Sequence, residues 1–199
     1  MTLKKFNDKI TEKKEFKMLY LIPLIIFILV LLWLIFTYNK LVRLKIMTEQ
    51  AWSDVDVQLK RRHDLIPNLV ETVKGYATHE RKTLEEVVKI RNTAISAKTT
   101  EEKIEAENML TQALRQLFAL AENYPDLKAS VNFQALQNEL AKIEETISMA
   151  RRYFNAVVRD YNTSISIFPN SLIAGILGFT RKIFFEMDET ERVVPQVKF

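Results

Sequence analysis

The chain of 199 residues contains no cysteine, only three glycines and only two histidines. Without cysteine it can form no disulfide and carry no lipid on a thiol. So few glycines leave no Gly-rich phosphate loop, and no GxSxG motif occurs. His63 and His79 do not stand in an HExxH or other metal-ligand spacing. These absences argue against an enzyme and predict neither a metal nor another cofactor.

The polar residues that could be considered for catalysis are not spaced as a catalytic site requires. Asp54 and Asp56 lie two residues apart and would face different sides of a helix, so they do not suit paired acid–base work. Asp54 better fits an ion pair with Arg61 or with a neighbouring helix. We expect His63 to be a surface polar residue or one associated with a helix kink. A hydrolase would require a buried carboxylate–histidine cluster, which spacing does not indicate.

The balance of charge also limits the partners. The net charge is only +4, and about three quarters of this excess lies in residues 1–17. The remainder of the chain is nearly balanced, so no nucleic-acid partner is indicated.

Residues 18–38 form a run without a single charge. At about 1.5 Å per residue, a helix of this length spans roughly 31 Å, close to the ~30 Å hydrocarbon core of a bilayer. A cleaved signal peptide is the alternative, but its apolar region is usually shorter and ends in small residues, whereas this run ends at Thr37-Tyr38. We therefore predict a retained membrane anchor, with lipid-facing residues Leu21, Ile25, Leu29, Leu32 and Phe36.

The flanks of this run predict an orientation. Six lysines precede it within residues 1–17, and three basic residues follow it within residues 39–55. Because Lys and Arg accumulate on the cytoplasmic side, residues 1–17 are predicted to be a cytoplasmic tail and the C-terminal domain to be extracytoplasmic. The protein is thus expected to be a single-pass protein of the cell membrane.

Residues 39–163 are predicted to form an all-α, antiparallel bundle of about four long helices. The first continues from the anchor to Gly75, with a kink near Pro67, and Thr78 is expected to cap the second, over residues 79–96. Thr99 and Glu102 form a capping box for the third helix, which ends near Pro125. The fourth carries a heptad-like, coiled-coil-type stripe: Leu136, Leu140, Ile143, Ile147, Ala150, Phe154, Val157 and Tyr161. Because no flexible linker follows Tyr38, we expect the anchor to fix the angle of the bundle to the membrane.

Residues 164–199 are predicted to form an apolar C-terminal tail, ending in an extended segment at 193–199. Residues 165–179 carry no charge but are too short, and too interrupted by Pro169, to cross a bilayer. Three interpretations stay open: a tail packed on the bundle, a membrane-surface segment, or a contact between subunits. The candidate interface residues are Trp52, Tyr76, Phe168, Leu172, Ile176, Phe179, Phe184 and Phe185.

Several long segments resemble the LemA family of bacterial single-span membrane proteins. They are residues 51–76, residues 150–163, the pair Phe168-Pro169, and residues 195–199. The resemblance implies a membrane helix leading into a long-helix bundle, with no established enzymatic activity. It further implies a link to internal membranes through a magnetosome-associated branch, and to a membrane metalloprotease encoded near some members. Two departures are His63, where Tyr is expected, and the longer lysine-rich N-terminal tail.

Two functions follow as hypotheses. The first is a scaffold that self-assembles as a homo-oligomer on the lipid bilayer and shapes or organises it. The second is an adaptor or sensor for a membrane protein such as a membrane metalloprotease, held by a groove or patch around Trp52 and Tyr76.

Overall fold

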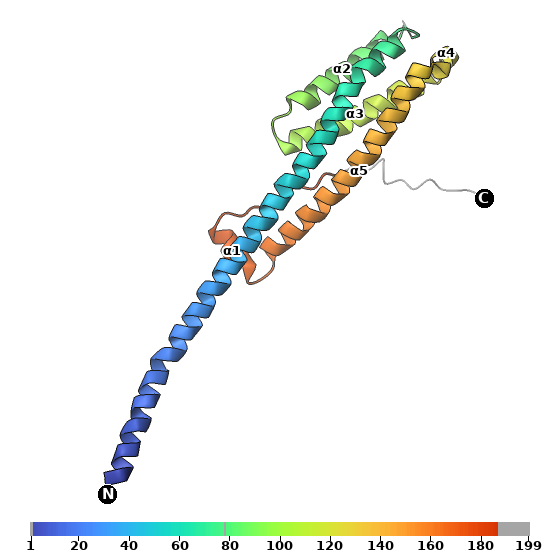
Figure 1. Cartoon of the computed structure of the whole chain (residues 1–199). Coiled ribbons are helices and arrows are strands. Elements are labelled where there is room, and N and C mark those ends of the chain that lie inside the picture. Colours follow the sequence, from blue (N-terminus) through green and yellow to red (C-terminus); the bar gives the residue numbers. More distant parts are fainter. Residues whose placement is uncertain (1, 78, 187–199) are drawn as a thin grey trace, which may run out of the picture. The chain divides into compact units, whose positions relative to one another are not determined.

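The predicted all-α fold is confirmed. The computed structural model describes residues 2–77 and 79–186, with side chains from Tyr20 onward, and every regular element in these ranges is a helix (Figure 1). In order, the helices are α1 (Thr2–Lys74), α2 (Arg81–Ser96), α3 (Thr100–Ala121), α4 (Pro125–Ala129), α5 (Val131–Ser166) and α6 (Asn170–Ile176).

The chain divides into two compact units, to which both α1 and α5 contribute. Among the described residues, the anchor unit comprises residues 2–46 and 161–181, and the bundle unit comprises residues 47–77, 79–160 and 182–186. Each unit has its own apolar contacts, described separately below.

The bundle unit is built around two adjoining groups of buried side chains. The larger group joins α1, α2, α3, α4 and α5, and includes Ile66, Leu69, Val73, Val87, Ala94, Leu110, Leu117 and Leu127. The second joins α1 and α5 with Ile104 and Phe185, and includes Ala51, Val55, Leu59, Ile147, Phe154, Val157 and Val158. The stripe predicted for α5 is confirmed as an inward face, since each of its eight residues is buried or half-buried. Burial of such stripes is the main source of stability in a helical bundle.

The helix ends follow local signals in most places. α1 passes Pro67 without ending and stops at Lys74, directly before Gly75. The cap predicted at Thr78 lies outside the described residues, and Glu80 occupies the N-cap position of α2 without a side-chain hydrogen bond. α3 ends at Ala121, a few residues before the end predicted near Pro125, and Pro125 begins the short α4, which was not predicted. Proline suits this first helical position because its missing N–H would be unpaired there anyway.

The capping box at the start of α3 is confirmed. The hydroxyl of Thr99 accepts a hydrogen bond from the Glu102 N–H at 3.1 Å, and the Glu102 carboxylate accepts from the Thr99 N–H at 3.3 Å. The same carboxylate accepts from the Lys98 N–H at 2.9 Å. The loop between α2 and α3 is therefore fixed by side chains that pair with the free N–H groups of the helix.

Replacing Thr99 with alanine should lower the free energy of unfolding of the bundle by about 1 kcal/mol, the usual cost of losing such a cap. Thr99→Ser, which keeps the accepting oxygen, should restore most of the loss. Urea unfolding of the full chain in detergent, followed by circular dichroism, measures both. A Thr99→Ala protein as stable as the parent would show that the cap contributes nothing.

The anchor unit contains the apolar run and the C-terminal end of α5. α5 continues to Ser166, beyond the change of pattern at Asn162, and a short turn leads to α6. Leu41, Tyr161, Ile165 and Ala174 form its buried core, against which Leu44 and Phe179 pack. The Tyr161 hydroxyl donates to the Thr180 carbonyl at 3.0 Å, and Arg181 Nη2 donates to the Ser166 hydroxyl at 3.1 Å. These bonds hold residues 180 and 181 on the end of α5.

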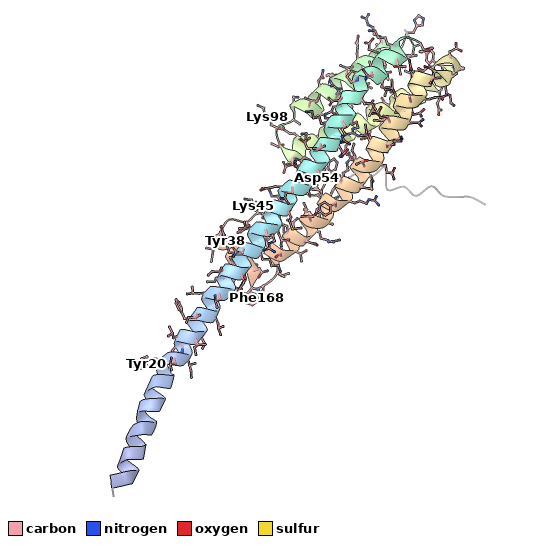
Figure 2. All side chains as sticks on the ribbon, in the orientation of Figure 1. Tyr20, Tyr38, Lys45, Asp54, Lys98 and Phe168 are labelled. Carbon is pink, nitrogen blue, oxygen red and sulfur yellow. The ribbon has the colours of Figure 1, made fainter. Side chains whose placement is uncertain are left out.

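The apolar run of α1 remains exposed within the structure. Of the described helices, α1 alone is long and apolar enough to cross a membrane, and only 6% of the apolar window is buried. A core helix of a soluble protein would be mostly buried, so that explanation is excluded. The predicted lipid-facing residues from Leu21 to Phe36 are 45–71% exposed (Figure 2). The helix therefore has the length, composition and exposure that a membrane span requires.

Candidate functional site

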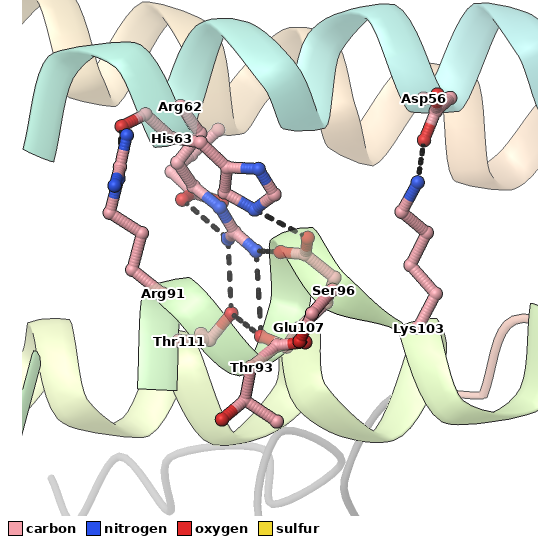
Figure 3. Close-up of polar contacts among 10 residues, drawn as sticks. Asp56, Arg62, His63, Arg91, Thr93, Ser96, Lys103, Glu107 and Thr111 are labelled. Carbon is pink, nitrogen blue, oxygen red and sulfur yellow. Dashed lines mark hydrogen bonds and ion pairs between the residues drawn. The ribbon is translucent and has the colours of Figure 1, made fainter. Parts of the chain in front are cut away.

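A cluster of charged side chains lies inside the bundle unit (Figure 3). Arg62 and His63 come from α1, Glu107 and Thr111 from α3, and Glu144 from α5. We call these five residues the polar cluster. Arg62 and Glu107 are 0% exposed and His63 is 5% exposed, so these three are removed from water, whereas Thr111 and Glu144 are half-buried. Buried charges are costly unless they are paired, and each of these is paired.

Arg62 is the centre of the cluster. Its Nη1 donates to Glu144 Oε1 at 2.8 Å and to the Thr111 hydroxyl at 3.1 Å. Its Nη2 forms an ion pair with Glu107 Oε2 and lies 3.4 Å from the Glu107 carbonyl oxygen. One guanidinium therefore connects α1 to both α3 and α5, as its planar fork of donors permits.

His63 completes the pairing of Glu107. Its Nε2 lies 2.7 Å from Glu107 Oε1, the carboxylate oxygen that Arg62 leaves unused. An ionised carboxylate can only accept hydrogen bonds, so Nε2 carries the proton. The expectation that His63 would be a surface residue is wrong, because its ring points into the bundle toward Glu107. The carboxylate of Glu107, 44 residues away in the sequence, holds the His63 ring in this position.

Further polar bonds join the same helices around the cluster. Arg91 Nε of α2 donates to the His63 carbonyl at 2.6 Å, and the Thr111 hydroxyl donates to the Glu107 carbonyl at 2.9 Å. Lys103 of α3 pairs with Asp56 of α1 (Figure 3). The pair predicted between Asp54 and Arg61 does not form: Asp54 is exposed, and Arg61 donates instead to Gln58 at 3.5 Å. Asp56, not Asp54, is the aspartate that bonds to a neighbouring helix.

The cluster shifts the ionisation of its two most buried members. Burial alone would raise the pKa of the Glu107 carboxyl, but the hydrogen bond from His63 and the charge of Arg62 together outweigh it and lower the pKa. Burial alone would lower the pKa of the Arg62 guanidinium, but the charges of Glu144 and Glu107 raise it. Each partner thus keeps the other ionised inside the bundle.

This coupling predicts a loss of stability in acid. Because the pKa of Glu107 is lower in the folded state than its ordinary value of 4.5, its contribution is complete above that value and is lost as the pH falls through the folded pKa. The melting temperature should therefore fall more steeply below about pH 4.5 in the parent protein than in Glu107→Gln. Glu102, whose pKa is lowered by hydrogen bonds from the Lys98 and Thr99 N–H groups, is common to both proteins and cancels in the comparison. Equal acid slopes would contradict the proposed pairing.

The cluster contains the carboxylate–histidine pair that a hydrolase would require, and its position relative to the hollows of the bundle unit bears on that interpretation. The bundle unit carries a groove of about 1040 Å³ between α1 and α2, and a hollow of about 450 Å³ between α3 and α5. His63 and Glu107 line neither, so a substrate in either would not meet them. Only Thr111 and Glu144, both bonded to Arg62, reach the second hollow. Among the described side chains there is also no group of His, Asp and Glu that could hold a metal.

Some of the predicted interface residues are used inside the bundle unit. Phe185 is 1% exposed, packs on Trp52 with ring centroids 6.0 Å apart, and lies under the Arg151 guanidinium at 4.1 Å. Asn155 holds its backbone, accepting from the Phe185 N–H at 2.8 Å and donating to its carbonyl at 3.0 Å. Trp52 is half-buried and also packs on Phe154 at 5.2 Å. Phe185 is thus a core residue in this structure, because the chain after residue 181 folds back onto the bundle's aromatic side chains.

The other predicted interface residues remain accessible. Tyr76 is 45% exposed and Phe184 is 39% exposed, both in the bundle unit. In the anchor unit, Phe168, Leu172 and Ile176 are 78%, 60% and 85% exposed. Phe179 is half-buried and meets Tyr38 edge to face at 6.5 Å. The structure therefore brings Phe168, Leu172, Ile176 and Phe179 into one unit, apart from Trp52 and Phe185.

Comparison with known proteins gives the family. A sequence profile of the LemA family matches residues 51–199. The chain belongs to the LemA family. It is 25% identical over 156 residues to Protein LemA of Metamycoplasma hominis, covering 78% of this chain and 71% of that protein. It is 23% identical over 193 residues to Magnetosome protein MamQ 2 of Paramagnetospirillum magneticum, covering 82% of this chain and 71% of that protein. Magnetosome protein MamQ of Magnetospirillum gryphiswaldense has the same identity and coverage.

The part of the chain that carries the LemA profile contains the whole polar cluster and α6. The match begins at Ala51, so it leaves out the apolar run of residues 18–38, which the structure places in α1. The resemblance of residues 51–76 to the family was visible in the sequence, but the polar cluster that Arg62 and His63 form was not predicted. A signal was present: Glu107 follows Ile104 and precedes Leu110 at intervals of three, which places a charge on the buried face of α3.

Proposed function

We propose that this LemA-family chain is a non-enzymatic, membrane-anchored scaffold that self-assembles at the bacterial membrane and organises or shapes it. The observation that carries the proposal is the exposed apolar surface of the anchor unit, which includes the span from Tyr20 to Phe36. A contiguous surface of this kind is an interaction site in soluble and membrane proteins alike. The N-terminal tail is cytoplasmic in this proposal, and the domain after the span is extracytoplasmic.

The bundle unit supports a structural role. Its most buried charged groups, Arg62 and Glu107, bond to each other and to residues of the neighbouring helices. Neither lines the groove between α1 and α2 or the hollow between α3 and α5, where a reacting molecule could be held. Charges arranged in this way fix the register of helices and are not available for acid–base work on a substrate.

Self-assembly is supported by the span itself. Apolar side chains point outward on all sides of α1 from Tyr20 to Phe36, so the span can be surrounded by lipid or by copies of itself. The relatives named as magnetosome proteins support a role in organising a membrane. The chain is also without Gly or Pro from residue 39 to residue 66, so no flexible linker follows the span.

The mass of the full chain in detergent tests the proposal. Light scattering on the size-exclusion peak should give a protein mass that is a large multiple of 23.3 kDa, unchanged on dilution through the micromolar range. The same multiple in two detergents of different micelle size excludes trapping in one micelle. A protein that runs as a monomer at micromolar concentration would reject self-assembly.

An adaptor for another membrane protein is the second candidate, and the groove between α1 and α2 favours it. Val70, Ala77, Leu84 and Val88 give the groove an apolar floor, and Glu71, Lys74, Arg81, Glu85 and Lys89 give it charged edges. An apolar floor with a charged rim is the usual composition of a protein-binding surface. A photo-crosslinker at Val88, 38% exposed, should capture a specific membrane protein in cells. Capture of this chain's own copies alone would reject the adaptor.

A further inference from the structure

α6 and the turn before it carry apolar side chains on two opposite sides. On one side, Ile173 and Ala174 are 7% and 2% exposed. On the other, Phe168, Leu172 and Ile176 are spaced by four residues and are at least 60% exposed. Leu172 and Ile176, four residues apart within α6, lie along one side of the helix, and Phe168 adds a third exposed apolar side chain in the turn before it. We call these three residues the α6 row.

The contacts of α6 place it just beyond the end of the membrane span. Ala174 belongs to the buried group that contains Leu41, and Phe179 packs against this group and meets the ring of Tyr38. Leu41 is three residues after Tyr38, a rise of about 4.5 Å along α1. The polar layer outside the hydrocarbon core is roughly 5–7 Å thick on each side. If residues 18–38 fill the core, α6 contacts α1 within this layer.

The chemistry around the α6 row also fits the surface of a bilayer. Residues 165–179 carry no charge, whereas exposed basic residues flank them in the same unit: Lys40, Arg43 and Lys45 of α1, and Arg181. Aromatic rings at Tyr38 and Phe179 lie at the same end of the span. Aromatic and basic residues at this level, with apolar side chains beside them, are typical of segments that lie in the interface.

We propose that the α6 row is a second membrane contact, inserted into the interfacial layer of the bilayer that α1 crosses, on the side where the span ends. The occupant of this surface is lipid, because the row lies in the same unit as the exposed apolar span and α6 packs on α1 directly after that span. The inference rests on the anchoring part of the proposed function, and it does not require self-assembly.

The absence of cysteine allows a direct test with single labels. An environment-sensitive fluorophore is attached to the cysteine of the Leu172→Cys or the Ile176→Cys variant of the full chain. Each labelled protein is then reconstituted in phosphatidylcholine–phosphatidylglycerol vesicles. Leu29→Cys, in the middle of the span, is the deep control. Val131→Cys, 79% exposed in the bundle unit, is the aqueous control. Lipids with a quencher near the headgroup should quench labels 172 and 176 several-fold more than label 131, and lipids with a deep quencher should act mainly on label 29.

Three results would overturn the inference, and they differ from one another. If labels 172 and 176 are as accessible to aqueous iodide as label 131 while label 29 is deep, the α6 row lies in water and the anchor stands. If the labels are shielded from iodide but lose that shielding when the labelled protein is diluted with lipid, a second copy occupies the row. If label 29 is itself aqueous, the anchor fails, and the proposed function fails with it.

Discussion

Replacing Glu107 with alanine should lower the free energy of unfolding of the bundle by about 3–5 kcal/mol, the cost of leaving a buried charge without its partner. The substitution removes the carboxylate that accepts from both Arg62 and His63. Arg62, 0% exposed, would keep only Glu144 as an anionic partner.

Urea unfolding of the full chain in detergent measures this loss. The fluorescence of Trp52, which packs on Phe154 and Phe185, reports on the bundle once Trp33 of the span is replaced by phenylalanine. Glu105→Ala is the matched control, because Glu105 is exposed two residues away on the same helix and should change stability by no more than about 0.5 kcal/mol. If the two substitutions cost the same, the polar cluster does not stabilise the bundle.

The helices could be predicted from the sequence because their signals are local. The stripe of α5 repeats at intervals of four and three, and all its members lie on the inward face. The capping box of Thr99 and Glu102 is likewise complete within four residues. α4 was missed because Pro125 gives two signals at one position: it stops the preceding helix and suits the first turn of the next.

The polar cluster and the burial of Phe185 could not be predicted in the same way. Arg62 and His63 stand in the charged stretch 60–64, which resembles a solvated surface until the chain is folded. Their partners are 44 to 82 residues away, on helices whose pairing the spacing does not specify. Phe185 likewise depends on Asn155, 30 residues away, which holds its backbone. Contacts between residues so far apart in the sequence form only when the bundle packs. The charge of Glu107 on the otherwise apolar stripe of α3 is the one local sign of such a contact.

Arg62 and Glu107 should also depend on each other strongly. Arg62→Met is expected to cost about 3–5 kcal/mol, because it leaves the buried Glu107 carboxylate with His63 alone. Glu107→Gln should cost about 1–3 kcal/mol, since a neutral amide cannot satisfy Arg62 as the carboxylate does. In the double variant no buried charge is left between these two positions, and the amide oxygen can still accept from His63. The double variant should therefore lose less than the sum, by about 0.5–3 kcal/mol.

A matched pair distinguishes this coupling from a general effect of charge. Arg81 and Glu85 form an ion pair at 3.2 Å on the surface of α2, with side chains 87% and 69% exposed. Two single variants and the double variant at Arg81 and Glu85 should give a coupling energy of no more than about 0.5 kcal/mol. If the losses in the free energy of unfolding at Arg62 and Glu107 were additive, the two charges would not interact. Coupling at the buried pair alone would mean that Glu107 is committed to Arg62. A carboxylate committed in this way joins α1 to α3 inside the bundle unit.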